Sequence, residues 1–179
     1  MTYKDATDLL DRYLQKENLK KHCYAVESAM AAYAPNTPEE LEKWKIVGLI
    51  HDFDYEKYPD NHPAKGAEIL KEEGWPEEII RALLSHSNRS GVKRENLLEK
   101  TLFAVDELTG FIVACALVRP DKLKSLDAKA VMSKMKNKAF AAKVSREDIT
   151  KGAEELGAPL DSHIETVIQA MKADSRLGL

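Results

Sequence analysis

Residues 49–67 read LIHDFDYEKYPDNHPAKGA, and the rest of the chain can be interpreted from the His51-Asp52 pair within this stretch. The apolar segment 46–50 leads directly into the pair, and His62 follows eleven positions after His51. An imidazole and a carboxylate at the end of a buried segment are costly unless they are paired or bound to a metal. The stretch therefore predicts the beginning of a metal site whose other ligands come from elsewhere in the chain.

Length and composition favour one globular domain and exclude several classes of protein. The 179 residues are enough for one domain with a real core, and the net charge of −3 gives no electrostatic reason to expect a nucleic acid or a membrane as partner. No stretch approaches the roughly 20 apolar residues of a membrane span, and the first residues, MTYKDATDLL, lack the layout of a signal peptide. Cys23 and Cys115 lie in apolar helical patterns typical of buried thiols, so we expect a cytoplasmic protein.

The hydrophobic pattern predicts an all-α fold. Nearly every segment repeats its apolar residues with the helical period, and few stretches alternate with period two. Capping residues, prolines and glycines divide the chain into helices expected at about 2–15, 18–34, 38–51, 63–74, 76–86, 96–118, 145–157 and 159–171. We therefore expect a single-domain helical bundle over residues 1–179.

Two segments after residue 118 are harder to assign. The Lys-rich stretch 121–140 carries only scattered apolar residues, and the final DSRLGL, residues 174–179, is expected to fray. The run of lysines from Lys122 to Lys143 could touch a phosphorylated ligand or a nucleic acid, but it is more typical of a solvated helix face. No nucleic-acid partner is expected.

Six polar residues of the metal-ligating types face the predicted core from different segments. By helical phase His22, His86 and Asp106 lie on or beside apolar stripes of three separate helices. A single inward histidine is more often a hydrogen-bonded core residue than a ligand. The ordered set is less easily explained in that way, and its members are His22, His51, Asp52, His62, His86 and Asp106, with His163 left out.

This ordered pattern resembles the His…His-Asp…Asp signature of the HD-domain superfamily of metal-dependent phosphohydrolases, carried here by His22, His51-Asp52 and Asp106. The resemblance covers roughly residues 19–118 and implies an HD-type helical bundle in which 121–179 is a C-terminal helical extension. His62 and His86 resemble the additional ligands of the dinuclear, HDIG-like branch of that superfamily.

The resemblance implies a two-metal site. His22, His51, Asp52 and Asp106 would hold one ion, and His62 and His86 would hold the second, with the Asp52 carboxylate bridging the two. Imidazoles and carboxylates suit two divalent transition-metal ions, first Fe or Mn, while Zn, Co, Ni and Mg also fit the ligand types. Two such ions about 3.5–4 Å apart can generate a bridging hydroxide at neutral pH that attacks phosphorus. Asp52 and His51 are therefore the predicted catalytic residues.

The chain departs from the branch directly after the signature. Many dinuclear members continue with Ile-Gly-Lys, whereas Phe53-Asp54-Tyr55 stands here, so a lysine for phosphate contact is absent at that position. Lys65 beside His62, or the cations of the basic loop 87–95, could replace it, although each could equally be a solvated surface charge. The substitutes in that loop are Arg89, Lys93 and Arg94. Asp54 could orient a ligand or cap a turn.

The leading functional hypothesis is a phosphohydrolase that cleaves a phosphate ester or anhydride of a nucleotide or another small molecule. A di-iron oxygenase of the same fold would use the same ligands, and a metal-binding regulatory module is a third alternative. The basic residues Lys93 and Arg94 favour phosphate chemistry. The metal, the substrate, the bond cleaved and the oligomeric state are not determined by the sequence.

Overall fold

Nine α-helices and two short 3₁₀-helices make up the regular structure of the computed structural model, which describes all residues 1–179. In chain order they are α1 (Tyr3–Tyr13), α2 (Glu17–Tyr33), α3 (Pro38–Ile50), α4 (Ala64–Glu72), α5 (Glu77–Ser85), η1 (Asn88–Ser90), α6 (Leu97–Leu117), α7 (Ala128–Met135), α8 (Arg146–Leu156), α9 (Leu160–Lys172) and η2 (Ser175–Leu177). The predicted all-α bundle is confirmed.

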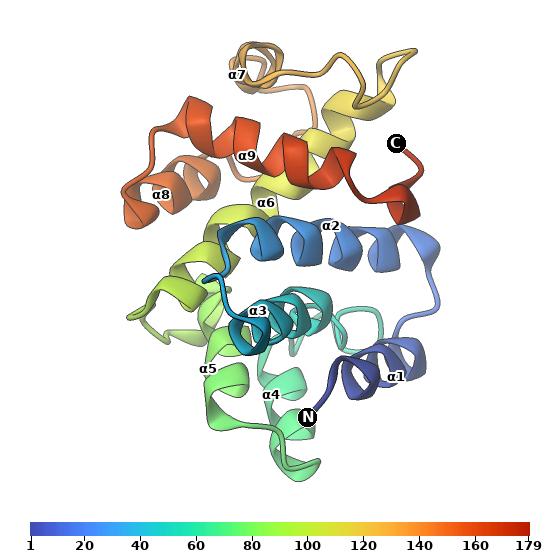
Figure 1. Cartoon of the computed structure of the whole chain (residues 1–179), viewed down its shortest axis with the longest axis vertical. Helices are drawn as coiled ribbons and strands as arrows, with labels where there is room; N and C mark the ends of the chain where they lie inside the picture. Colours follow the sequence, from blue (N-terminus) through green and yellow to red (C-terminus); the bar gives the residue numbers. More distant parts are fainter.

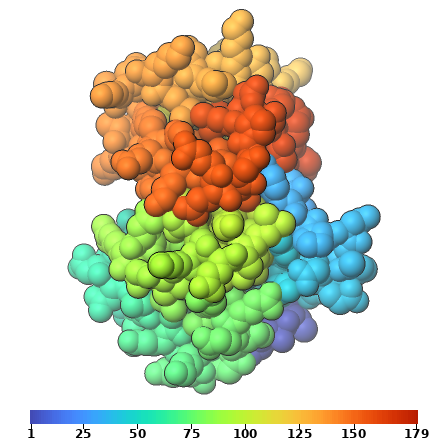
Figure 2. All heavy atoms as spheres, turned by 90° about the vertical axis from the view of Figure 1, so that its left-hand side faces the viewer, coloured from blue at the N-terminus to red at the C-terminus, as the bar shows by residue number.

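Helices α2 and α6 hold the two ends of the molecule together. Figure 1 shows α7, α8 and α9 grouped at one end and α1, α4 and α5 at the other, with α2 between them. Helix α6 packs against α2 and α5 as well as α8 and α9. Thirteen of its 21 residues are buried, as expected for a helix surrounded by others. The space-filling view in Figure 2 shows the same order on one face, with the C-terminal helices above the green α4–α5 segment.

Glycines allow two of these helix pairs to approach closely. A Cβ added to Gly48 on α3 would lie 2.8 Å from the Glu27 Cα on α2, so the backbones of α2 and α3 are in near contact. A Cβ on Gly152 of α8 would lie 2.5 Å from the Ala104 Cα on α6. These contacts fix the position of α3, which ends at His51, and of α8, which covers the neighbouring part of α6.

Local signals in the sequence explain most helix boundaries. The side chains of Thr2, Thr37 and Ser145 each accept a hydrogen bond from the backbone three residues later, as predicted for capping residues. The Lys-rich stretch contains the short helix α7, which has Val131 as its only buried residue. Such a helix has too few apolar positions for its period to be recognised in the sequence.

The prediction that residues 174–179 fray is wrong. Leu177 is buried, and the guanidinium of Arg176 donates to Oε2 of the buried Glu27 over 2.9 Å. Asp174 also accepts a 2.7 Å hydrogen bond from the Ser28 hydroxyl. The segment is short and polar, so its order depends on partners in α2 that local sequence does not reveal.

Both cysteines are buried and free, as predicted. None of the helices combines the length and the apolar character that crossing a membrane requires.

Candidate metal centre

Five helices, through a face or an end, bring the six predicted ligands together. His22 lies on α2, Asp106 on α6, and His51 and His86 are the residues that end α3 and α5. Asp52 follows His51 directly, and His62 precedes the start of α4 by two residues. Because each residue lies at a rigid helix or directly beside one, the fold fixes its position before any ligand binds.

The Asp52 carboxylate lies between two sets of imidazole nitrogens. Its Oδ1 is 3.1 Å from the Nε2 of His62 and 3.4 Å from the Nε2 of His86. Its Oδ2 faces the other way, 3.7 Å from the Nε2 of His22 and 3.6 Å from the Nε2 of His51. Asp52 therefore belongs to two three-residue groups whose ligand atoms all lie within 4.8 Å of one another.

Asp106 closes the group formed by His22, His51 and Asp52. Its Oδ1 lies 3.0 Å from the Nε2 of His22 and 3.5 Å from the Nε2 of His51. The Nε2 atoms of those two histidines are 3.2 Å apart, and those of His62 and His86 are 3.1 Å apart. The structure thus places all six predicted residues around two adjacent points, with Asp52 common to both.

The second ring nitrogen of three histidines already has an acceptor. The Nδ1 of His51 lies 2.8 Å from the Gly48 carbonyl oxygen, and the Nδ1 of His86 contacts the Leu83 carbonyl oxygen. A carbonyl can only accept, so both Nδ1 atoms carry the proton and both Nε2 lone pairs point into the centre. At each facing pair of Nε2 atoms, the lone pair of His51 or His86 therefore needs a proton or a metal ion between it and its neighbour.

The carboxylate of Asp54 is the acceptor for the Nδ1 of His62. The Asp54 Oδ1 accepts from the Nδ1 of His62 over 2.8 Å, and its Oδ2 accepts from the Gly66 backbone N–H in the first turn of α4, also over 2.8 Å. Asp54 is completely buried. The two roles considered for it, orienting a ligand and capping a turn, are therefore both present in one carboxylate.

The electrostatics of the centre are those of a cation site. Burial lowers the pKa of His51, but the carboxylates of Asp52 and Asp106 outweigh burial and raise it to about 9. Burial also lowers the pKa of His62, but the carboxylates of Asp52 and Asp54 outweigh burial and raise it to about 9. Burial opposes ionisation of Asp52, yet the surrounding imidazoles hold its pKa well below its ordinary value. Protons thus occupy positions where divalent ions would compete with them.

The residues present fit divalent metal ions. Four imidazole nitrogens and two carboxylates are ligands that Mn, Fe, Co, Ni and Zn accept, and hydrogen-bonded second ring nitrogens are typical of histidine ligands. The Nε2 atoms of each pair lie 3.1–3.2 Å apart, too close for two lone pairs to face each other without a proton or a metal ion between them. This donor set supports metal binding.

A cavity of about 520 Å³ opens onto this centre. Its inner wall is formed by His22, Asp52, His62, His86 and Asp106. Two aromatic residues, Tyr55 and Phe103, also line the cavity, and Tyr55 is 43% exposed. The cavity is large enough for a small phosphorylated molecule.

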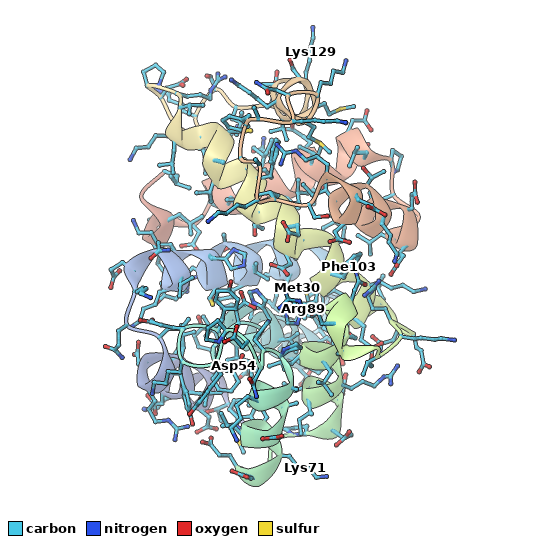
Figure 3. The ribbon with its side chains drawn as sticks, turned by 180° about the vertical axis from the view of Figure 1, so that it is seen from behind. Met30, Asp54, Lys71, Arg89, Phe103 and Lys129 are labelled. Carbon is cyan, nitrogen blue, oxygen red and sulfur yellow. The ribbon has the colours of Figure 1, made fainter.

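Of the four cations considered for phosphate contact, the structure brings one to this cavity. Arg89 lines it, and its guanidinium makes no hydrogen bond or ion pair within the chain. Figure 3 shows Arg89 and Phe103 near the middle of the molecule, above the labelled Asp54. Arg89 is therefore free to contact a ligand.

The other three cations considered for phosphate contact do not line the cavity. Lys65 pairs with Glu68 on the surface of α4 at 2.9 Å. The nearly buried guanidinium of Arg94 pairs with Glu155 at 2.6 Å and lies 3.7 Å from the centre of the Phe103 ring. Lys93 lies on a separate hollow together with Arg94.

The structure also adds residues that the sequence did not single out. Asn88, Glu107 and Asp148 line the same cavity as the metal centre. The sequence could have pointed to Glu107, because this residue directly follows the predicted ligand Asp106. Asp148 is 41 positions after Glu107 and has the pattern of a normal acidic residue in the first turn of a helix, so only the packing of α8 on α6 reveals it.

Comparisons with known proteins agree with this geometry. No curated protein and no solved structure matches the chain. The sequence model of the HD domain matches residues 19–110, a little more than half of the chain. The matched segment contains all six residues of the centre, from His22 to Asp106. Proteins with this domain are generally hydrolases that depend on divalent metals, and this chain belongs to the HD domain family.

Proposed function

We propose that this protein is a dinuclear-metal phosphohydrolase that cleaves a phosphate ester or anhydride of a small molecule such as a nucleotide. The observation that carries the proposal is the position of Asp52, whose two carboxylate oxygens face two different pairs of histidine nitrogens. One carboxylate between two ligand sets is the arrangement expected for a bridging ligand. HD domain membership supports the hydrolytic chemistry.

The two proposed sites would divide the six residues between them. His22, His51 and Asp106 would hold one ion, His62 and His86 the other, and Asp52 both. When bound, such a pair of ions supplies Lewis acidity and lowers the pKa of water towards neutrality. The carbonyls of Gly48 and Leu83 and the carboxylate of Asp54 keep three of the imidazoles in the tautomer that this requires.

Besides the proposed metal ions, Arg89 supplies positive charge at the cavity. Its unpaired guanidinium at the cavity can hold phosphate oxygens in a bidentate manner and orient the ester against the centre. Phe103 and Tyr55 narrow the cavity and displace water from one side of the ligand. Orientation and exclusion of water are the parts of catalysis that these residues perform.

Phosphate release tests the proposal directly. The purified protein would be loaded with Fe, Mn, Co, Ni, Zn or Mg and assayed with nucleotides, dinucleotides and simple phosphate esters. We expect turnover that requires metal and falls at least about a hundredfold in Asp52→Ala, while Asp60→Ala, a change at an exposed loop aspartate, serves as the matched control. Equal turnover in Asp52→Ala and wild type would refute the assignment.

The di-iron oxygenase remains the alternative chemistry for the same ligand set. Oxygen consumption by the iron-loaded protein with non-phosphorylated substrates, together with no phosphate release across the panel, would replace the hydrolase with that assignment.

A further inference from the structure

Two carboxylates in the cavity have no role in the proposed metal centre. Glu107 lies on α6 directly after Asp106, and Asp148 lies in the first turn of α8. Both line the 520 Å³ cavity that opens onto the centre. Neither forms an ion pair with any lysine, arginine or histidine of the chain, although most other partly buried carboxylates here do. An anionic wall beside a phosphate site therefore needs an explanation.

Each of these carboxylates is held by one oxygen and leaves the other free. The Glu107 Oε2 accepts from the Ser145 backbone N–H over 3.0 Å, and the Asp148 Oδ1 accepts from the Asn88 side-chain amide over 3.2 Å. Glu107 Oε1 and Asp148 Oδ2 have no donor in the structure. Two positioned acceptors without donors are what a ligand bearing hydroxyl or ammonium groups would complete.

The charges in the cavity restrict which phosphates can bind. The two divalent ions of the proposed centre and Arg89 would carry five positive charges, against four negative charges on Asp52, Asp106, Glu107 and Asp148. A phosphate monoester dianion is accommodated by such a site. A nucleoside diphosphate or triphosphate would place further negative charge beside Glu107 and Asp148, and no unpaired cation other than Arg89 lines the cavity to offset it.

We propose that Glu107 and Asp148 determine specificity, and that the substrate is a phosphate monoester whose alcohol part carries hydrogen-bond donors, either hydroxyl or ammonium groups. This inference rests on the proposed phosphohydrolase activity and narrows it from esters and anhydrides to monoesters. The phosphate lies against the metal centre and Arg89, and the donors of the alcohol part bind the free oxygens of Glu107 and Asp148. Arg89 and Phe103, both labelled near the middle of the molecule in Figure 3, line this cavity.

A purely structural role is the competing explanation. Glu107 fixes the Ser145 backbone at the start of α8, and an aspartate in the first turn of a helix is favourable by itself. A structural role would lower activity towards all substrates to the same extent. A specificity role changes the ratio between substrates, and this difference separates the two explanations.

The experiment measures kcat/KM of the metal-loaded protein for glycerol 3-phosphate, phosphoethanolamine, phenyl phosphate, and a nucleoside mono-, di- and triphosphate. Wild type is compared with Glu107→Gln and Asp148→Asn, which keep the shape and the anchoring acceptor. Glu147→Gln, an exposed neighbour on α8 that does not line the cavity, is the control. Glycerol 3-phosphate and phosphoethanolamine distinguish hydroxyl from ammonium donors.

We expect wild type to prefer a donor-bearing monoester over phenyl phosphate and over the di- and triphosphates. In Glu107→Gln the ratio of kcat/KM for that monoester to kcat/KM for phenyl phosphate should fall by about tenfold or more, mostly through KM. The amide oxygen stays on the Ser145 N–H, so the NH₂ group faces the ligand's donor and cannot accept from it. The ratio of triphosphate to monophosphate turnover should rise, and Glu147→Gln should match wild type.

Two results would overturn the inference while the proposed function stands. They are a wild-type preference for di- or triphosphates, and losses in Glu107→Gln and Asp148→Asn that are equal for all substrates. Absence of phosphate release from every ester, by wild type shown to contain metal, would instead refute the phosphohydrolase and this inference with it.

Discussion

The carboxylate of Asp54 joins the Nδ1 of His62 to the backbone N–H of Gly66, with both contacts at 2.8 Å. One buried side chain thus orients a proposed metal ligand and caps the helix that follows it. The contact with Gly66 is close enough that a Cβ on this residue would lie 2.9 Å from the Asp54 carboxyl carbon. Glycine at position 66 therefore provides the space in which Asp54 lies.

Asp54→Asn should weaken metal binding without a change in any proposed ligand. An asparagine can accept from only one of the two N–H groups, because its NH₂ group must face the other donor. We expect a loss of stability of about 1–3 kcal/mol and a metal affinity roughly 10–100-fold lower. Chelator competition measures the affinity and urea unfolding the stability, with Asp60→Asn as the exposed control. Wild-type metal affinity in Asp54→Asn would show that His62 does not need this partner.

Of the six proposed ligands, His22, His86 and Asp106 could be predicted from helical phase. His51, Asp52 and His62 were recognised from the polar pattern after the apolar segment 46–50 and from its resemblance to the HD-domain signature. Asp54 was recognised only as one of two alternatives, since its partner Gly66 is twelve positions away and has no side chain to signal the contact. Glu107, Asp148 and the ordered C-terminus depend on how α6, α8 and α2 pack. Local periodicity carries no information about such pairings, and the same limit applies to Arg94, whose partner Glu155 is 61 positions away.

The glycine pair Gly152 and Gly110 should respond in opposite ways to alanine. A Cβ on Gly152 would overlap Ala104 of α6, so Gly152→Ala should cost about 1–3 kcal/mol through displacement of α8. A Cβ on Gly110 would meet no atom within 4 Å, and Gly110→Ala should gain about 0.5–1 kcal/mol from helix propensity. Urea unfolding of both variants checks this, and equal effects would contradict the close packing of α6 and α8.

His163 should make the protein less stable in acid. Its Nε2 lies 3.1 Å from the Ala104 carbonyl oxygen and its Nδ1 lies 2.6 Å from the Tyr33 hydroxyl, so the buried ring is neutral with the proton on Nε2. Burial lowers the pKa of His163 below its ordinary value of 6.5. The unfolded chain therefore binds a proton more readily, and the contribution of this residue is full above about pH 6.5 and declines as the pH falls below it.

Urea unfolding between pH 5 and 8 checks the role of His163. We expect the free energy of unfolding to fall with decreasing pH less steeply in His163→Gln than in wild type. Chelator should be present in all samples, so that metal binding does not contribute to the slope. Parallel pH profiles for the two proteins would show that His163 does not titrate differently on folding.

Divalent metal should stabilise the folded chain in proportion to its binding. At a free metal concentration a hundred times the dissociation constant, the expected gain is about 2.7 kcal/mol, because the unfolded chain lacks the assembled ligands. Asp52→Ala should lose most of this gain, since Asp52 belongs to both ligand groups. Thermal unfolding with and without chelator measures the effect independently of any activity. A shift in Asp52→Ala as large as that in wild type would place the bound metal elsewhere.

The C-terminal segment should contribute measurably to stability through Arg176 and Glu27. Glu27 is 1% exposed and accepts from the Tyr3 hydroxyl over 2.8 Å and from the Arg176 guanidinium over 2.9 Å, while Lys45 lies 3.4 Å away. Arg176→Ala removes the best-placed cation from a buried carboxylate and should cost about 1–3 kcal/mol in urea unfolding. Lys71→Ala, at an exposed lysine that Figure 3 shows at the far end of the molecule, should change stability by less than about 0.5 kcal/mol. If Arg176→Ala is as stable as Lys71→Ala, the remaining partners satisfy Glu27, and the order of residues 174–179 depends on the burial of Leu177 rather than on this ion pair.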